Sequence, residues 1–167
     1  MSSKGVVFIN GRIDQEMYRR VIKELQEAER ATKKNEIVTV YFDSQGGDSQ
    51  TACGLYDIVR SCKRKVTGIV AGRADSGAPV ILQACHRRLM TEHSSIMLHR
   101  LSLCIGELSL GDAKTTVQRF EQLDEKMIDI ISAKARYSRD EVAKLMSVDV
   151  HLDASKALEF GLIDQVI

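Results

Sequence analysis

The sequence predicts one α/β domain built on a largely parallel sheet, with helices packed against it. Three observations support this prediction. Runs of β-branched residues alternate with amphipathic segments, and strands that alternate with helices form right-handed crossovers. The 167 residues fit a single domain and contain no linker, repeat or low-complexity tract. Because Trp is absent and aromatic residues make up only 5% of the chain, the core must be aliphatic.

The N-terminal segment predicts a strand followed by a helix. The apolar run at residues 6–9 is typical of a strand, and we expect it to stop at the turn signal Asn10-Gly11. Asp14 is suited to cap a helix over residues 15–34. Apolar residues recur at helical spacing in that segment with charged residues between them, which is typical of a helix lying on one side of a sheet.

Two further strands and a second helix are predicted next. The β-branched run at residues 37–42 is typical of a buried strand, and a loop containing Gly46-Gly47 follows it. A helix over about residues 50–62 leads to a third strand over residues 66–70, which we expect to end at Ala71-Gly72.

The middle of the chain predicts two helices and a strand between them. The segment SGAPVILQAC predicts a turn into an apolar helix, because Pro79 is tolerated in a first helical turn. SSIMLH predicts a short strand ending at His99. A long helix over residues 109–135 is indicated by an apolar stripe, which consists of Val117, Phe120, Leu123, Met127, Ile130 and Ile131.

The last segments carry clear signals for helix ends. Ser138 and Glu141 match a capping box for a short helix ending near Met146. The closing DASKALEFGLIDQVI predicts a helix, a stop at Gly161 and a terminal strand.

Composition argues against several classes of function. Lys and Arg number 24 against 23 Asp and Glu, so no excess positive charge is available for phosphates and no nucleic-acid partner is expected. The opening MSSKGVVFINGRID has no apolar run long enough for a secretory signal or a membrane span. No dinucleotide-binding or phosphate-loop pattern occurs, so we expect no cofactor.

The cysteines predict thiols rather than a metal site or disulfides. No two lie at metal-ligand spacing, so we expect no metal and buried free thiols at Cys53, Cys62, Cys85 and Cys104. Free thiols, together with the absence of a secretory signal, predict a reducing, cytoplasmic location.

The most informative stretch is GRADSGAP, at residues 72–79. It follows a strand and opens a helix, which places Ser76 at or just before the helix N-terminus. Unpaired N–H groups and the positive end of the helix dipole there would face the charge that develops on an attacked carbonyl oxygen. That is a suitable place for an acyl-transfer nucleophile. An ordinary serine N-cap is the structural alternative.

Gly46-Gly47 follows a buried strand, where parallel α/β sheets place their sites. Glycine leaves a backbone N–H open to a ligand, so Gly47 could supply one oxyanion donor and Gly77 the other. A simple turn is the alternative.

One histidine and one aspartate are needed to complete such a site. The chain has four histidines, which are His86, His93, His99 and His151. Only His99 and His151 adjoin apolar stretches, so they are the candidates for a general base, and a structural histidine at a strand end is the alternative. Asp149 could hold the imidazole in the required tautomer, or it could be an exposed loop residue. Asp153 is better explained as a helix N-cap.

Taken together, these segments resemble the Clp protease proteolytic subunit (ClpP) family over nearly the whole chain. YFDSQGGDSQTACGLYDIV is similar to the family's strand, glycine loop and helix, and GRADSGAPVILQA to its nucleophile segment. SSIMLH is similar to the strand that ends in the catalytic His, and VDVHLDASKALEFGLID to the closing segment with the catalytic Asp. The resemblance implies Ser76 as nucleophile, His99 as general base, Asp149 as orienter, and Gly47 and Gly77 as the oxyanion hole.

The resemblance also implies an architecture and partners. The fold would be ClpP/crotonase-like, with repeated ββα units, a head at about residues 1–100 and 147–167, and a handle-like helical region at about 101–146 with a protruding long helix. The activity would be that of a serine endopeptidase acting on peptides or unfolded proteins. The family implies a homo-oligomer in which heptameric rings stack in pairs, fed by an ATP-dependent unfoldase.

The chain departs from the family pattern at several places. Gln45 replaces a loop proline, Asp75 a small apolar residue, and Gly77 a methionine. The segment RLSLCIGELSLG after His99 lacks the family's Gln-Pro and paired glycines, and the start of the chain lacks the axial-loop region. These differences indicate a divergent, N-terminally short member, and they count against double-ring stacking and an unfoldase partner.

Two other functions are compatible with the same sequence features. One is a non-catalytic scaffold subunit of a mixed ring, which Asp75 and the altered segment after His99 favour. The other is an acyl-CoA enzyme of the related crotonase fold, which also uses paired backbone N–H groups as an oxyanion hole. A Ser–Lys peptidase is less well supported, because nothing marks a lysine as a buried base.

Overall fold

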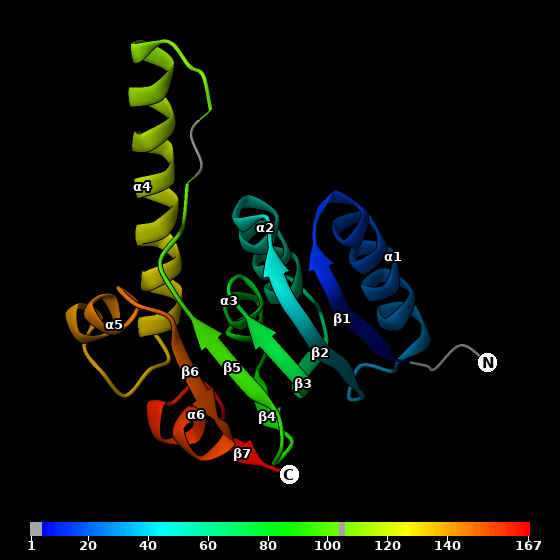
Figure 1. Ribbon diagram of the computed structural model, residues 1–167. Coiled ribbons are helices and arrows are strands. Elements are labelled where there is room, and N and C mark those ends of the chain that lie inside the picture. The colour runs from blue at the N-terminus through cyan, green and yellow to red at the C-terminus, as the bar shows by residue number, and fades with distance from the viewer. Residues whose placement is uncertain (1–4, 104–105) are drawn as a thin grey trace.

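A seven-stranded sheet forms the centre of the protein in the computed structural model, which describes residues 5–103 and 106–167 (Figure 1). Five strands lie side by side and run parallel, in the order β1 (Val6–Ile13), β2 (Ile37–Gly47), β3 (Lys65–Asp75), β4 (Arg87–Met90) and β7 (Gln165–Val166). β5 (Ser95–Leu98) pairs in parallel with the end of β3, and β6 (Val150–Asp153) pairs antiparallel with β5. The predicted α/β class with a largely parallel sheet is confirmed.

β3 pairs with two different strands in turn along one of its edges. Thr67–Val70 pair with β4, whereas Arg73–Asp75 pair with β5. Ser94 is buried where the two pairings separate: its Oγ accepts a hydrogen bond from the Gly72 N–H at 2.8 Å and donates one to the Val70 carbonyl at 3.2 Å. The C-terminal end of β3 therefore lies between β2 and β5.

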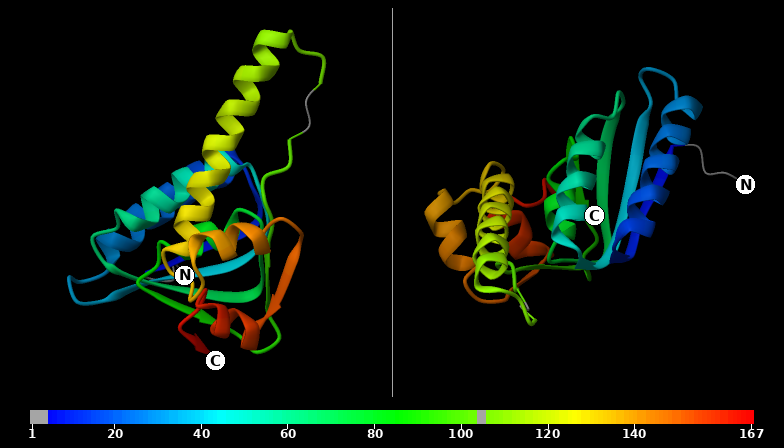
Figure 2. Two further views of the ribbon diagram at one scale, coloured as in Figure 1. Left: turned by 90° about the vertical axis from the view of Figure 1, so that its left-hand side faces the viewer. Right: turned by 90° about the horizontal axis from the view of Figure 1, so that it is seen from above.

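Helices cover the sheet, and one of them projects beyond it (Figures 1 and 2). They are α1 (Gln15–Ala31), α2 (Ser49–Arg60), α3 (Ala78–Leu82), α4 (Leu110–Ser132), α5 (Arg139–Leu145) and α6 (Ala154–Phe160). α1 and α2 lie along the same face of the sheet, and α4 extends well past the strands (Figures 1 and 2). None of the helices within the described ranges has the length and apolar character needed to cross a membrane.

The core is largely aliphatic, as the composition predicts, with Phe42 and Phe160 among its members. Alternate residues of the first strands are fully buried, including Val7, Ile9, Val38, Val40 and Phe42. They pack in one cluster with the buried stripe of α1, which consists of Met17, Val21, Leu25 and Ala28. Burial of each such large side chain stabilises the folded state by about 1.5–3 kcal/mol.

Three predicted strand ends are wrong, and all three involve glycine. β1 continues through Asn10-Gly11, because Gly11 adopts φ +83° and the strand passes the site with a shift in register. β2 continues through the predicted loop to Gly47, since Gly46 and Gly47 pair with Arg12 and Ile13 of β1. Turn propensity is local, whereas the neighbouring strand supplies hydrogen bonds that the local sequence does not reveal. β3 likewise runs past Ala71-Gly72 to Asp75.

The predicted helix ends agree more closely. Asp14 Oδ1 accepts hydrogen bonds from the N–H groups of Glu16 and Met17, although α1 ends at Ala31 rather than residue 34. The capping box of Ser138 and Glu141 is present at α5. Asp153 caps α6, and Gly161 ends that helix with φ +89°. The short strands β4 and β6 were not predicted.

A buried arginine holds the C-terminal segment onto β4. Arg88 bonds to Asp164 through its backbone N–H at 2.8 Å and through its guanidinium. The same guanidinium donates to Gln83 Oε1 at 2.6 Å and to the Gly161 carbonyl at 2.9 Å. Burial works to raise the pKa of Asp164, but the hydrogen bonds from Arg88 outweigh it and leave the pKa below its ordinary value.

The cysteines within the described residues are free thiols. Cys85 is buried, and Cys53 and Cys62 are half-buried, while Cys104 lies outside the described residues. Burial raises the pKa of the Cys85 thiol to about 12. A thiol held in this neutral form is a poor nucleophile.

Candidate active site

Ser76 occupies the turn between β3 and α3 in an unusual backbone conformation. Its φ of +59° is the single positive value among the non-glycine residues that the structure describes. That conformation costs about 1–2 kcal/mol for an L-residue. The Ser76 N–H donates to the Met97 carbonyl at 2.9 Å, which extends the pairing of β3 with β5 by one residue. Gly77 then caps α3, and Pro79 lies in its first turn.

His99 reaches Ser76 because β5 lies beside the end of β3. It follows Met97 by two residues, just past the last residue of β5. Its Nε2 lies 2.8 Å from Ser76 Oγ, and both residues are half-buried. In the tautomer that leaves Nε2 without a proton, the imidazole can accept the hydroxyl proton.

The two glycines of the β2 end perform different packing roles. A Cβ on Gly46 would lie 2.5 Å from Ser76 Cβ and 2.6 Å from the Asp75 carbonyl, and the φ of Gly46 is +83°. Gly46 therefore allows β2 to approach the Ser76 turn. A Cβ on Gly47 would instead overlap the backbone of Ile13 on β1. The sequence indicates Gly47 as an oxyanion donor but not this packing role of Gly46, although the paired glycines are a signal for both.

Gly77 is required by close packing rather than by its backbone angle. Its φ is −73°, and an added Cβ would lie 2.8 Å from the Ala52 Cβ of α2. The Gly77 nitrogen lies 3.2 Å from the position of a Cβ on Gly46. The backbones of the two predicted oxyanion segments, the Gly46-Gly47 end of β2 and the Ser76–Gly77 turn, are thus in direct contact.

Strand pairing brings the backbone of Asp149 near that of His99, but within the described residues no hydrogen bond joins the two. Asp149 immediately precedes Val150, which pairs with Leu98, the residue before His99. Asp149 and His99 therefore adjoin the same end of the β5–β6 pairing. Asp149 is exposed. Within residues 5–103 and 106–167, the His99 ring has one hydrogen bond, to Ser76, and none to Asp149. The structure brings together Ser76 and His99, but not the carboxylate of Asp149.

The other histidines lie elsewhere. His151 is exposed on β6, opposite Met97, and within the described residues no hydrogen bond joins it to Ser76. His86 Nδ1 accepts a hydrogen bond from the Val66 N–H at 3.1 Å, and His93 is in an exposed turn. Of the two base candidates, the one in contact with Ser76 is His99.

Asp75 points to the face of the sheet away from the helices. Its neighbour Ala74 is fully buried in the core, and the pairing registers place Asp75, Met97 and His151 in one row across β3, β5 and β6. The Asp75 side chain is 16% exposed, and its carboxylate lies 3.9 Å from the Arg73 guanidinium. Burial raises the pKa of this carboxyl, and the attraction of Arg73 and His151 only partly offsets the rise.

A pocket of about 240 Å³ opens between α2 and α4. It begins two residues beyond Gly46, at Asp48, Ser49 and Gln50, and its other wall is formed by the α4 side chains Thr116, Arg119, Phe120 and Leu123. Its lining is mixed and includes one carboxylate, one cation and two large apolar groups. In the described part of the chain, no group of three or more His, Cys, Asp or Glu side chains is arranged to hold a metal ion.

The family model and the relatives that match this chain all concern one family. The family model described as Clp protease matches residues 1–167. The chain is 28% identical to the ATP-dependent Clp protease proteolytic subunit 2 of Treponema pallidum over 164 residues, which are 96% of this chain and 81% of that protein. It is 26% identical to the proteolytic subunit 3 of Rhodococcus jostii over 163 residues, 96% of this chain and 80% of that protein. The Clp protease proteolytic subunit of Carsonella ruddii is 25% identical over 170 residues, which cover 100% of this chain and 86% of that protein.

Proposed function

The chain belongs to the Clp protease family, and from this premise we propose that it is a serine endopeptidase that cleaves peptides or unfolded proteins. Ser76 is the nucleophile, His99 the general base and Asp149 the orienter. The observation that carries the proposal is the 2.8 Å contact between His99 Nε2 and Ser76 Oγ. A base within hydrogen-bond reach is what activates a weak hydroxyl nucleophile.

The reaction proceeds through an acyl-enzyme. Ser76 Oγ attacks the carbonyl carbon of the scissile peptide bond while its proton passes to His99 Nε2. The carbonyl oxygen becomes negatively charged and receives hydrogen bonds from the N–H groups of Gly47 and Gly77. As the C–N bond breaks, His99 returns the proton to the leaving amine. A water molecule then attacks the ester carbon while His99 takes its proton. The bond from that carbon to Ser76 Oγ breaks, His99 returns the proton to Oγ, and the acid is released.

The strained conformation of Ser76 supports this role. An L-residue held at positive φ is retained where neighbouring structure fixes it, and such residues cluster at functional sites. Here the bond to the Met97 carbonyl and the contact with Gly46 fix the turn from both sides. The hydroxyl is thereby presented at the C-terminal edge of the sheet, next to the start of α3.

The pocket between α2 and α4 is the candidate recess for a substrate side chain. It starts at Asp48, next to the proposed oxyanion donor Gly47, so a peptide bound across the Ser76 turn would run past it. Phe120 and Leu123 would contact an apolar part of the side chain, and Arg119 would favour a nearby negative group.

Active-site labelling tests the proposal directly. We expect a fluorophosphonate probe to acylate the folded protein at one site, and Ser76→Ala to abolish the labelling while the circular dichroism spectrum stays unchanged. Labelling should also fall in acid, because a protonated His99 cannot accept the Ser76 proton. A folded wild-type protein that takes up no probe between neutral and mildly alkaline pH would contradict the proposal.

One observation favours a second function, that of a non-catalytic subunit in a mixed ring. Asp149 is exposed and makes no bond to His99 within the described residues. Under this alternative, the chain would be inert alone and would co-purify with an active homologue. Labelling of the isolated chain separates the two functions.

A further inference from the structure

One carboxylate lies within the apolar stripe of α4. The buried residues of this helix are Asp124, Met127, Ile128 and Ile131, and Asp124 exposes only 7% of its surface. The sequence predicted Leu123 and Ile130 in this stripe, but both are only half-buried. A buried charge costs several kcal/mol unless it is paired and hydrogen-bonded. The position of Asp124 therefore depends on its partners.

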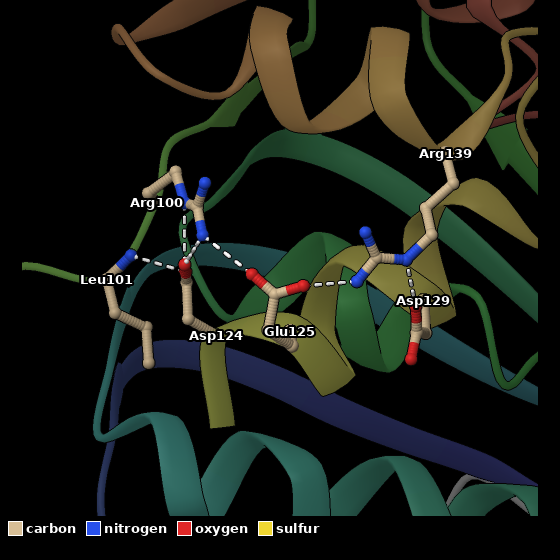
Figure 3. A network of polar contacts seen from close by, with 6 residues as sticks. All are labelled: Arg100, Leu101, Asp124, Glu125, Asp129 and Arg139. Atoms are coloured by element: carbon tan, nitrogen blue, oxygen red, sulfur yellow. Dashed lines mark hydrogen bonds and ion pairs between the residues drawn. The ribbon is translucent and has the colours of Figure 1, made fainter. Parts of the chain in front are cut away.

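Both partners of Asp124 come from the two residues that follow His99. The Leu101 N–H donates to Asp124 Oδ1 at 2.9 Å, and Arg100 Nε donates to Oδ2 at 2.6 Å (Figure 3). The carboxylate thus bonds to one backbone group and one side chain of the same short segment. This arrangement fixes the direction of the chain as well as its position.

The segment bonded to Asp124 lies outside the strands and helices. β5 ends at Leu98, and residues 99–103 have no regular secondary structure. The Arg100 N–H donates to the carbonyl of Met146, the C-cap residue that follows α5 and precedes Asp149 by three positions. The backbone after His99 is therefore held at two points, one on α4 and one at the end of α5.

Arg100 extends the contacts to a surface network. Its guanidinium also donates to Glu125 at 2.9 Å, and Glu125 pairs with Arg139 of α5, which bonds Asp129 (Figure 3). These outer ion pairs are largely exposed, and exposed pairs contribute about 0–1 kcal/mol. The restraint on the chain rests mainly on the buried Asp124.

We propose that Asp124 and Arg100 are positioning residues for His99: they fix the backbone on its C-terminal side to α4 and so hold its Nε2 within reach of Ser76 Oγ. The kinetic consequence rests on the proposed function, whereas the structural consequence does not. A displacement of about 1 Å in a reacting group can reduce a rate by about a hundredfold, so the restraint has a measurable effect.

The chain provides a matched control for Asp124. Asp164 also accepts hydrogen bonds from a backbone N–H and a guanidinium, here both from Arg88, but it lies on the C-terminal segment away from His99. Asp124→Asn and Asp164→Asn each replace one oxygen acceptor by a donor facing an arginine. Both should lower thermal stability, but the loss of positioning is expected in Asp124→Asn alone.

Two measurements on the full chain test the proposal. The first is the rate constant for acylation of Ser76 by a fluorophosphonate, followed across pH. The second is the ¹⁵N spectrum of the imidazoles in histidine-labelled protein, with the His99 signals assigned by their loss in His99→Gln. Arg100→Gln serves as a second variant, since it keeps the Leu101 N–H bond to Asp124 and is milder if Asp124→Asn folds poorly.

We expect Asp124→Asn to slow acylation by about tenfold to a hundredfold, Arg100→Gln to slow it less, and Asp164→Asn to leave it within about twofold of wild type. The His99 ¹⁵N signals should shift in the first two variants only. Unchanged His99 signals and unchanged acylation in a folded Asp124→Asn or Arg100→Gln protein would overturn the proposal. If the wild type takes up no probe, the proposed peptidase activity fails, and the His99 signals still decide the positioning role.

Discussion

At the residue scale, a comparison of Gly46 with Gly11 distinguishes the cost of backbone strain from the cost of steric overlap. Both have φ +83°, but a Cβ on Gly46 would meet Ser76 Cβ at 2.5 Å, whereas a Cβ on Gly11 would meet nothing within 4 Å. Gly11→Ala should therefore cost only the left-handed strain of about 1–2 kcal/mol and leave acylation intact. Gly46→Ala should cost more and also displace the Ser76 turn, with loss of labelling. Urea unfolding and probe labelling measure the two effects, and equal labelling in both variants would contradict this account.

Asp149 is the residue whose role depends most on movement. If a small shift lets its carboxylate bond His99, Asp149→Asn should reduce the acylation rate by roughly four orders of magnitude, as loss of tautomer control does in other triads. If the carboxylate stays in solvent, the variant should label at the wild-type rate. The rate of probe uptake, measured with thermal stability as the control for folding, distinguishes the two outcomes.

At the element scale, Arg88 and Asp164 join β4 to the C-terminal segment that carries β7. Asp164→Asn replaces one of the two oxygens that face the buried guanidinium with an N–H donor, and should lower the free energy of unfolding by about 1–3 kcal/mol. Because the folded pKa of Asp164 lies below its ordinary value, its contribution is present above the unfolded pKa and is lost as pH falls through the lowered one. The difference between wild type and variant should thus persist at neutral pH and shrink in acid, as urea unfolding across pH would show.

The helix ends agree with prediction better than the strand ends because helix caps depend on local contacts. The caps at Asp14, Ser138 and Asp153 bond to groups two or three residues away, so the information lies within one turn of helix. The end of β2 is set by β1, a strand more than thirty residues earlier in the chain. No local pattern around Gly46-Gly47 carries that information.

At the scale of the whole molecule, α4 is the feature that most requires a partner. It projects from the sheet (Figure 2). Leu110, the first residue of α4, is 74% exposed, and Leu108, just before the helix, is 49% exposed. We propose that residues 101–146 form a handle and the rest of the chain a head, and that the handle contributes to assembly of a homo-oligomeric ring.

A native mass measurement tests the assembly. Seven copies of the 18.6 kDa chain would form a ring of about 130 kDa, and a stacked pair of rings would have about twice that mass. We expect the single ring or the pair, each labelled by the probe. A labelled monomer would retain the catalytic proposal and contradict the ring, and an unlabelled chain found only with another subunit would favour the scaffold function.

Residue patterns alone predicted the six helices, five of the seven strands, the helix caps, the largely aliphatic core and the segments around Ser76, His99 and Gly46-Gly47. These depend on residue type, spacing and contacts within one helical turn. Three features became visible in the folded chain alone: β5 lies beside the end of β3, Ser76 adopts a left-handed backbone, and Asp124 is buried against Arg100. Strand pairing and the burial of a charge are fixed by partners far away in the chain, and a single sequence does not state which distant residues meet.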